Sequence, residues 1–254
     1  DRGLTNTSIS LRVDGERPFN EAQTLELPRR WRDESKEFSR DRYNDESLPL
    51  QLADQDWIDA PLRDTSGRTI RPIYLHLEAG RREIALENLS SYPVELASLR
   101  LESPERILSY TEYRDSLGAR AQHAAASDIS IEIDAIQYVA KNSYDVRMGS
   151  LNDPTVSPSD PVDRLLNVIE GQSWDAAREE IVYEVTVPED GNYALTLHYQ
   201  NPRVDLSAFR TITVNDEVPF AGFAPYEFIA TGSARWRHET LSSEDGEPLR
   251  IYLP

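Results

Sequence analysis

The sequence contains no cysteine, which excludes disulfides, thiolate nucleophiles and cysteine-bound metals. It also lacks a run of about eighteen apolar residues, the length that a membrane-spanning helix needs. The first residues, Asp1-Arg2-Gly3, do not form a signal peptide, so the signal of a secreted parent protein is expected outside this sequence. Gly-x-Ser-x-Gly, P-loop and dinucleotide-binding fingerprints are absent as well, which removes the signatures of several large enzyme classes.

Basic residues are scarce relative to acidic ones. Twenty-seven Lys and Arg face 45 Asp and Glu, which gives a formal net charge of -18, and Lys36 and Lys141 are the only lysines. Such a surface repels nucleic-acid phosphates and anionic membranes, so we expect neither a nucleic-acid partner nor direct membrane insertion. A neutral glycan is unaffected by this field, and a cation is attracted.

What the chain does contain is a diverged internal repeat. Val-Asp-Gly-Glu-Arg-Pro-Phe at 13–19 returns as Val-Asn-Asp-Glu-Val-Pro-Phe at 214–220, an offset of 201 (214 − 13). The repeated segments share residue pattern and order, and they are 13–19 with 214–220, 30–34 with 235–239, and 73–75 with 251–253. Because repeats mark duplicated supersecondary units, the 254 residues are interpreted as two copies of one module.

Most remaining patterns indicate β-strands. Apolar and polar residues alternate, as on half-buried strands, in the segments 8–14, 72–78, 82–88, 95–101, 129–135, 180–187, 192–199 and 209–214. Asp14-Gly15 is typical of a hairpin turn, and Pro188–Gly191 is expected to join 180–187 and 192–199 into an antiparallel hairpin. Many short strands separated by turns predict an all-β fold built of β-sandwich modules.

Three stretches interrupt the strands. Residues 108–126 are the one good helical segment, and Ser109 with Glu112 forms a capping-box pattern at its start. Residues 35–71 are polar and resemble a long surface insertion, whereas 150–163 contain three prolines and predict a loop.

These patterns predict a domain organisation. A first module, 1–104, lacks its opening strands; a helical linker covers 105–127; a second module, 128–254, lacks its closing strands. Alternatively, the two halves complement each other in one circularly permuted sandwich.

Several motifs resemble one family. Val-Pro-Glu-Asp-Gly-Asn-Tyr at 187–193, with the strand and the 214–220 segment after it, is similar to the galactose-binding-like β-sandwich of carbohydrate-binding modules. Ser-Tyr-Thr-Glu-Tyr at 109–113 and Leu-Asn-Val-Ile-Glu-Gly-Gln-Ser-Trp at 166–174 resemble motifs of tandem modules inside large extracellular solute-binding proteins of bacterial ABC transporters. The resemblance covers nearly the whole chain and implies jelly-roll modules joined by a short helix.

The resemblance also implies a function. The modules are expected to be non-catalytic and to bind a glycan weakly, or to serve as a scaffold for the main solute-binding lobes of an extracellular parent protein attached to the cell surface. An alternative is that they are accessory modules of a secreted glycoside hydrolase or lyase, and a third is a purely structural spacer. Nothing in the sequence marks the facing carboxylate pair of a glycosidase.

Candidate ligand-binding residues follow from sugar chemistry, which needs flat aromatic faces and carboxylate or amide groups for hydroxyls. Trp57 and Tyr43 lie in the polar insertion, with Asp56 beside Trp57 as a hydroxyl acceptor. Trp174 is a further candidate on a loop rim. For both tryptophans the alternative is a packing role: Trp57 would plug the insertion onto the sandwich, and Trp174 would anchor its motif.

A weaker pattern concerns metal binding. Glu132 and Asp134 resemble the first-strand carboxylate pair of calcium-binding carbohydrate modules, and residues i and i+2 of a strand share one face. A calcium ion there is one interpretation, and a solvated strand face is the other. The four histidines, His76, His123, His198 and His238, show no metal-ligand spacing.

Overall fold

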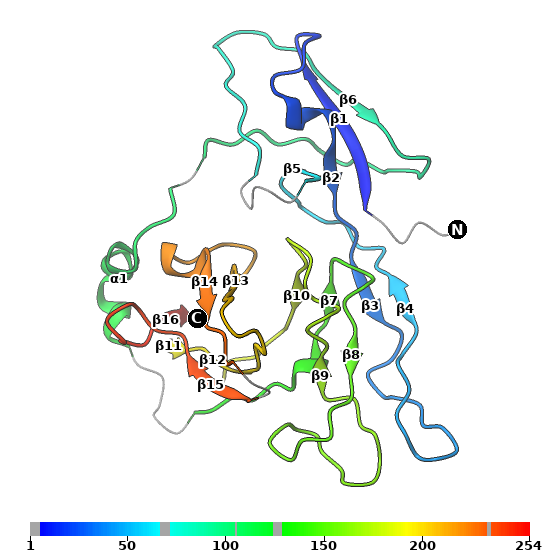
Figure 1. Cartoon of the computed structure of the whole chain (residues 1–254). Coiled ribbons are helices and arrows are strands. Elements are labelled where there is room, and N and C mark those ends of the chain that lie inside the picture. The colour runs from blue at the N-terminus through cyan, green and yellow to red at the C-terminus, as the bar shows by residue number, and fades with distance from the viewer. Residues whose placement is uncertain (1–5, 67–71, 105, 124–128, 233–234) are drawn as a thin grey trace. The chain divides into compact units, whose positions relative to one another are not determined.

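The computed structural model describes residues 6–66, 72–104, 106–123, 129–232 and 235–254. Short antiparallel strands dominate it, with one α-helix of eight residues (Figure 1). The predicted all-β class is therefore confirmed. The more specific galactose-binding-like topology stays a prediction.

The chain forms two compact units. Unit 1 comprises residues 1–102 and 133–184, and unit 2 comprises 103–132 and 185–254. The predicted second module, 128–254, is thus divided, because its first part joins the sheet of the N-terminal part. Trp31 of strand β3 (Trp31–Asp33) pairs with Lys141 of strand β7 (Ala140–Lys141), a contact that local sequence patterns do not reveal.

Unit 1 contains two four-stranded sheets and a strand pair. The first sheet has the order β5-β2-β1-β6, with β5 (Arg63–Asp64), β2 (Leu25–Leu27), β1 (Thr7–Val13) and β6 (Ile84–Asn88). The second has the order β10-β7-β3-β4, where β10 is Ile181–Val182 and β4 is Gln51–Ala53. Strand β8 (Met148–Gly149) pairs with β9 (Val168–Ile169). Two short 3-10 helices, η1 (Asn20–Gln23) and η3 (Ala135–Gln137), complete the unit.

Two apolar clusters stabilise unit 1. The buried residues of the first are Ile9, Leu11, Ala22 and Leu25, under the sheet that contains β1. Those of the second are Ile136, Tyr138, Met148 and Leu166, near β7 and β8. The long polar stretch from 35 to 66 contributes β4 and β5, and it packs Leu62 against the first cluster and Phe38 against the second.

Unit 2 consists of three strand pairs and the helix. The pairs are β11 (Gly191–Ala194) with β16 (Arg250–Leu253), β12 (Thr196–Tyr199) with β15 (Arg237–Thr240), and β13 (Ala208–Arg210) with β14 (Tyr226–Phe228). A 3-10 helix, η4 (Ala221–Phe223), precedes β14. The core is aromatic and includes Phe220, Phe223, Tyr226, Phe228 and Leu241.

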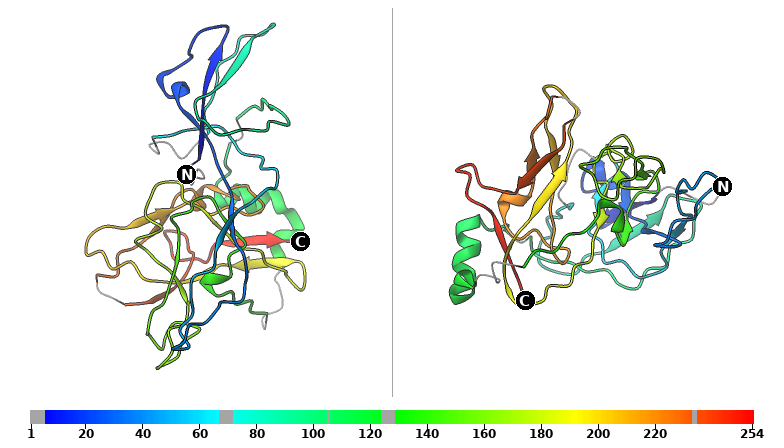
Figure 2. Two further views of the ribbon diagram at one scale, coloured as in Figure 1. Left: turned by 90° about the vertical axis from the view of Figure 1, so that its right-hand side faces the viewer. Right: turned by 90° about the horizontal axis from the view of Figure 1, so that it is seen from below.

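The helix α1 (Tyr110–Leu117) begins with the predicted capping box, in which Ser109 and Glu112 bond reciprocally. The α-helix is shorter than the predicted 108–126, since the chain continues as a 3-10 helix, η2 (Gly118–Gln122), and 124–126 lie outside the described residues. α1 runs beside β16 (Figure 2). The hydroxyls of Tyr110 and Tyr113 accept hydrogen bonds from the backbone N–H groups of Arg250 (3.0 Å) and Tyr252 (2.9 Å). The helix therefore supplies hydrogen-bond acceptors for two backbone N–H groups on the edge of β16.

Several strand predictions are wrong. The segments 72–78, 95–101 and 129–135 are not assigned as strands. The predicted hairpin 180–199 does not form, because β10 pairs with β7 whereas β11 and β12 pair with β16 and β15. The alternation is present in all these segments. The strands within 180–199 pair with distant parts of the chain instead of with each other, whereas 72–78, 95–101 and 129–135 have no strand partner among the described residues.

The repeated segments adopt the same local structure. Asp14 and Gly15 have φ of 51° and 81°, and Asn215 and Asp216 have φ of 51° and 66°. Two successive positive φ values are those of a type I′ turn, for which Asn, Asp and Gly are the preferred residues. Val13 bonds with Glu16 across the first turn, as Val214 does with Glu217 across the second.

The strands flanking the two turns also correspond. Thr7 pairs with Leu27 and Ile9 with Leu25 in unit 1; 201 residues later (208 − 7), Ala208 pairs with Phe228 and Arg210 with Tyr226. A one-residue slip would exchange the two faces of the sheet, so equal register places corresponding side chains on corresponding faces.

Candidate functional site

Trp57 follows β4 and is 66% exposed. Within the described residues, neither its indole nor the Asp56 carboxylate beside it has a hydrogen-bond partner or ring contact. Asp54 orders this corner, since its N–H donates to the Arg30 carbonyl (2.8 Å) and its Oδ1 accepts the Asp56 N–H (3.3 Å). The exposed ring is at odds with the packing interpretation of Trp57.

Tyr43 is also 66% exposed, on the loop that precedes β4. The Arg42 guanidinium lies over its ring, 4.6 Å from the centroid, and Arg42 Nη2 donates to the hydroxyl at 2.6 Å. One ring face is therefore occupied. No hydrogen bond or ring contact joins Tyr43 to Trp57 or Asp56 in the described part of the chain.

The other predicted residues occupy different positions. Trp174 is half-buried and its Nε1 donates to the Glu179 carbonyl (3.0 Å), an arrangement that anchors a turn. Glu132 is exposed and Asp134 half-buried on a segment that is not a strand, and they fall on opposite sides of the division between the units. No group of three or more His, Cys, Asp or Glu placed to hold a metal ion is found among the described residues. The calcium ion stays a prediction.

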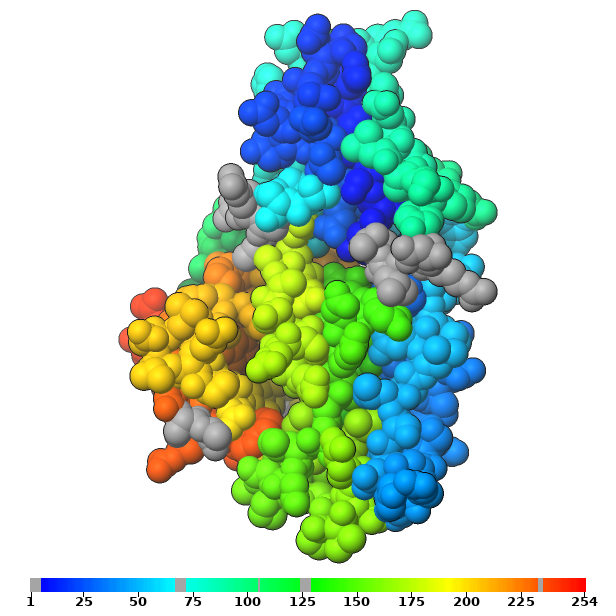
Figure 3. All heavy atoms as spheres, turned by 45° about the vertical axis from the view of Figure 1, so that its right-hand side comes forward, coloured from blue at the N-terminus to red at the C-terminus, as the bar shows by residue number. Residues whose placement is uncertain are grey.

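The structure also contains two adjoining open hollows in unit 1, which the sequence did not indicate. One, of about 280 Å³, is lined by residues of the loop 150–167; the other, of about 250 Å³, lies between that loop and residues 41–48. The two loops share one face of the unit in space-filling view (Figure 3). Ser150 and Arg164 line both hollows.

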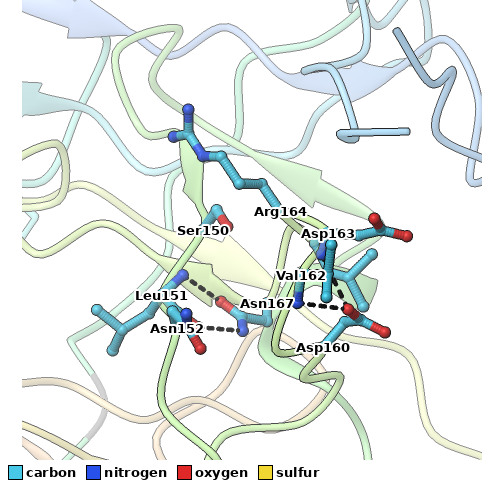
Figure 4. Close-up of a pocket in the computed structure, with 9 residues that line it drawn as sticks. Ser150, Leu151, Asn152, Asp160, Val162, Asp163, Arg164 and Asn167 are labelled. Carbon is cyan, nitrogen blue, oxygen red and sulfur yellow. Dashed lines mark hydrogen bonds between the residues drawn. The ribbon is translucent and has the colours of Figure 1, made fainter. Parts of the chain in front are cut away.

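A buried amide holds the first hollow open. The Asn167 Oδ1 accepts the Leu151 N–H (2.9 Å), and its Nδ2 donates to the Leu151 carbonyl (2.8 Å), as Figure 4 shows. The Nδ2 also donates to the Pro158 carbonyl (2.8 Å). Asp160 orders the opposite rim, since its Oδ1 accepts the N–H groups of Val162 and Asp163. These two N–H groups stabilise the carboxylate and lower the pKa of Asp160 below its usual value.

Carboxylates of residues 41–48 bind the backbone of the loop 150–167. Asp45 Oδ1 accepts the Arg164 N–H and Glu46 Oε2 accepts the Leu166 N–H, each at 2.9 Å. The Glu46 N–H in turn donates to the Arg164 carbonyl (2.9 Å). Arg40 forms an ion pair with Glu46 (3.1 Å). The carboxylates of Asp45 and Glu46 therefore hold the two loops together.

Three polar groups on the rim remain for a ligand. The Ser150 hydroxyl, the Asn152 amide and the Arg164 guanidinium have no hydrogen-bond partner within the described residues. A hydroxyl, an amide and a guanidinium together can bind a hydroxylated or anionic small molecule. No aromatic side chain lines this hollow, so it lacks a stacking platform.

Searches with protein-family models, curated proteins and solved structures find no match to this chain. Among the helices of the described residues, none has the length and apolar character needed to cross a membrane.

Sequence reasoning missed the hollows because they depend on contacts between loops 119 residues apart, such as Asp45 with Arg164. The only local signal was the asparagine of the Leu166-Asn167 motif, a buried polar residue that must find partners.

Proposed function

We propose that this chain is a non-catalytic carbohydrate-binding or scaffolding part of a larger extracellular protein, of the kind that serves bacterial carbohydrate import. The motif resemblance and the all-β fold support this proposal. The observation that carries the sugar-binding part is the exposed Trp57 ring with the unpaired Asp56 carboxylate beside it.

The chemistry of that pair suits a pyranose. The indole offers a flat apolar face to the C–H side of the sugar, and the carboxylate accepts bonds from its hydroxyls. Nothing has to be displaced from either group before binding. A single solvent-facing platform predicts weak binding, because most of the ligand stays in water.

The test compares Trp57→Ala with the unchanged chain on an array of neutral gluco-, galacto-, manno- and xylo-oligosaccharides, followed by calorimetric titration of the best ligand. Loss of the stacking face should weaken binding by about tenfold or more. The melting temperature should change by no more than about 1–2 °C, because the ring is exposed.

Tyr74→Ala is the matched control, since Tyr74 is another exposed aromatic side chain, and binding should be retained. If no oligosaccharide binds at millimolar concentration, the scaffolding role is favoured. A large fall in melting temperature for Trp57→Ala would assign the ring to packing and overturn the sugar platform.

A further inference from the structure

In unit 1, strand β1 has a partner on both edges. It pairs with β2 on one side and with β6 on the other, where Val13 faces Ile84 and Ile9 faces Asn88. The turn after β1 fixes the start of β6: the Asp14 N–H donates to the Glu83 carbonyl (2.8 Å), and Asp14 Oδ1 accepts the Glu83 N–H (2.9 Å).

In unit 2, strand β13 and residues 211–214 are the counterpart of β1, yet only one edge is paired. β14 takes the place of β2 in the same register. No strand takes the place of β6 on the opposite edge within the described residues. Asn215 occupies the position of Asp14 with the same φ of 51°, and it has no hydrogen-bond partner in the described part of the chain.

The exposure of the apolar side chain at this edge is consistent with a missing neighbouring strand. Leu11 in β1 is 2% exposed, and Ile84 and Leu86 of β6 pack against its cluster. The counterpart of Leu11 is Ile212 (212 − 201 = 11), which packs against the unit 2 core but is only half-buried. An additional strand with apolar residues at alternate positions would cover it, as β6 covers Leu11.

We propose that this edge of unit 2, residues 208–215, is a docking site for an extended segment of a partner protein, which adds as an antiparallel strand in the way that β6 adds to β1. The segment carries apolar side chains at every second residue. It needs no arginine at the position of Arg82, because the Asp14–Arg82 ion pair (3.0 Å) has only the neutral Asn215 as counterpart. Given the net charge of -18, a neutral or basic segment is favoured over an acidic one.

The hydrogen-bonding pattern identifies which amides take part. In an antiparallel pair, alternate residues bond to a given neighbour. Asp14 bonds to Glu83, and Ser8 accepts the Leu89 N–H. The even-numbered residues of β1 therefore direct their backbone N–H and C=O groups toward β6, and these are called the outward residues. Their counterparts are Phe209, Thr211, Thr213 and Asn215. The backbone N–H of Ile212 points away from the open edge, because it donates to the Phe223 carbonyl (2.9 Å).

The test is residue-resolved amide hydrogen exchange on the full chain, with a synthetic peptide of residues 81–90 as the probe strand. Exchange at Phe209, Thr211, Thr213 and Asn215 should slow at least tenfold on adding the peptide. Exchange at Arg210, Ile212 and Val214 should change little. A control peptide with proline in place of Ala85 and Glu87, which removes two backbone donors, should give no protection.

Two variants of the chain sharpen the result. Asn215→Gly keeps the positive φ but removes the side-chain acceptor, so peptide affinity should fall several-fold. Thr211→Pro removes one outward N–H and should abolish protection. The Ile212 amide, slow in a folded unit 2, reports that each variant is folded, and Asn215→Gly serves alone if the proline variant is not.

Four outcomes would overturn the proposal: no protection at millimolar peptide, equal protection by the proline peptide, unchanged affinity of Asn215→Gly, or outward amides that are already slow in the chain alone. Protection that rises with protein concentration without peptide would assign the edge to a second copy of the chain instead of a partner.

Discussion

Lys141 lies inside unit 1, only 1% exposed. Its ammonium group donates to the carbonyls of Val146 and Tyr144, and Asp33 is the opposing charge that acts on it most strongly. Burial disfavours the charged form and lowers the pKa of Lys141 to about 8, although Asp33 partly offsets this effect. Keeping the charged ammonium group buried therefore costs desolvation free energy at neutral pH, while the group holds two backbone carbonyls by hydrogen bonds.

This cost predicts a dependence of stability on pH. Between pH 8 and 10 the folded chain loses the Lys141 proton while the unfolded chain keeps it, so the free energy of unfolding should rise with pH, by about 2 kcal/mol. Above pH 10 the trend should reverse, because burial raises the pKa of Tyr138 well above its usual value, so the folded chain then keeps a proton that the unfolded chain loses.

Urea denaturation at several pH values measures this slope, and Lys141→Met is the comparison. The variant should show a flatter profile between pH 8 and 10. Equal slopes for the two proteins would mean that Lys141 does not titrate in this range.

Tyr43 and Trp57, in a polar stretch without periodic apolar residues, are both exposed. The local composition made both of them candidates for exposed aromatic side chains, and for Trp57 it left a packing role open. The environment of Arg164 could not be predicted, because it depends on Asp45 and Glu46 reaching the backbone of a loop far along the chain.

At the scale of elements, local patterns again predict some features correctly and miss those that depend on distant residues. β1, β6 and the start of α1 were predicted correctly, since alternation, a type I′ turn and a capping box are local signals. The segment 95–101 shows alternation as clearly, yet its leucines are exposed and it has no strand partner in the described residues. Alternation specifies which face a strand buries, and pairing decides whether the strand forms.

The edge of β16 gives a prediction for α1. Tyr113→Phe removes the acceptor of the Tyr252 N–H while its ring still packs on Phe220 (centroids 5.1 Å apart). The free energy of unfolding should fall by about 1 kcal/mol, and amide exchange at Tyr252 should quicken.

Tyr193→Phe is the matched control for this edge. Its hydroxyl donates to the Glu189 carbonyl (2.8 Å), so exchange at Tyr252 should be unaffected. If Tyr113→Phe leaves the Tyr252 amide equally slow, the hydroxyl is not what covers the edge.

At the scale of the whole molecule, each unit has buried apolar residues of its own: Leu11 lies in one of the two clusters of unit 1, and Phe220, Phe223 and Leu241 lie in the cluster of unit 2. Leu11→Ala and Leu241→Ala should each cost about 2–5 kcal/mol, because a fully buried leucine leaves a cavity. Hydrogen exchange should show the loss mainly in the unit that carries the substitution.

The two substitutions serve as controls for each other. Equal loss of protection throughout the chain from either one would mean that the units unfold as a single cooperative body.

The alternating path of the chain through the two units has a consequence for synthesis on the ribosome. Trp31 cannot meet Lys141, nor Glu26 its ion-pair partner Arg178 (3.1 Å), until more than a hundred later residues have emerged. Trp31 therefore stays without its strand partner Lys141 while α1 is being made. Such a delay lengthens the time for which this large apolar side chain can take part in aggregation.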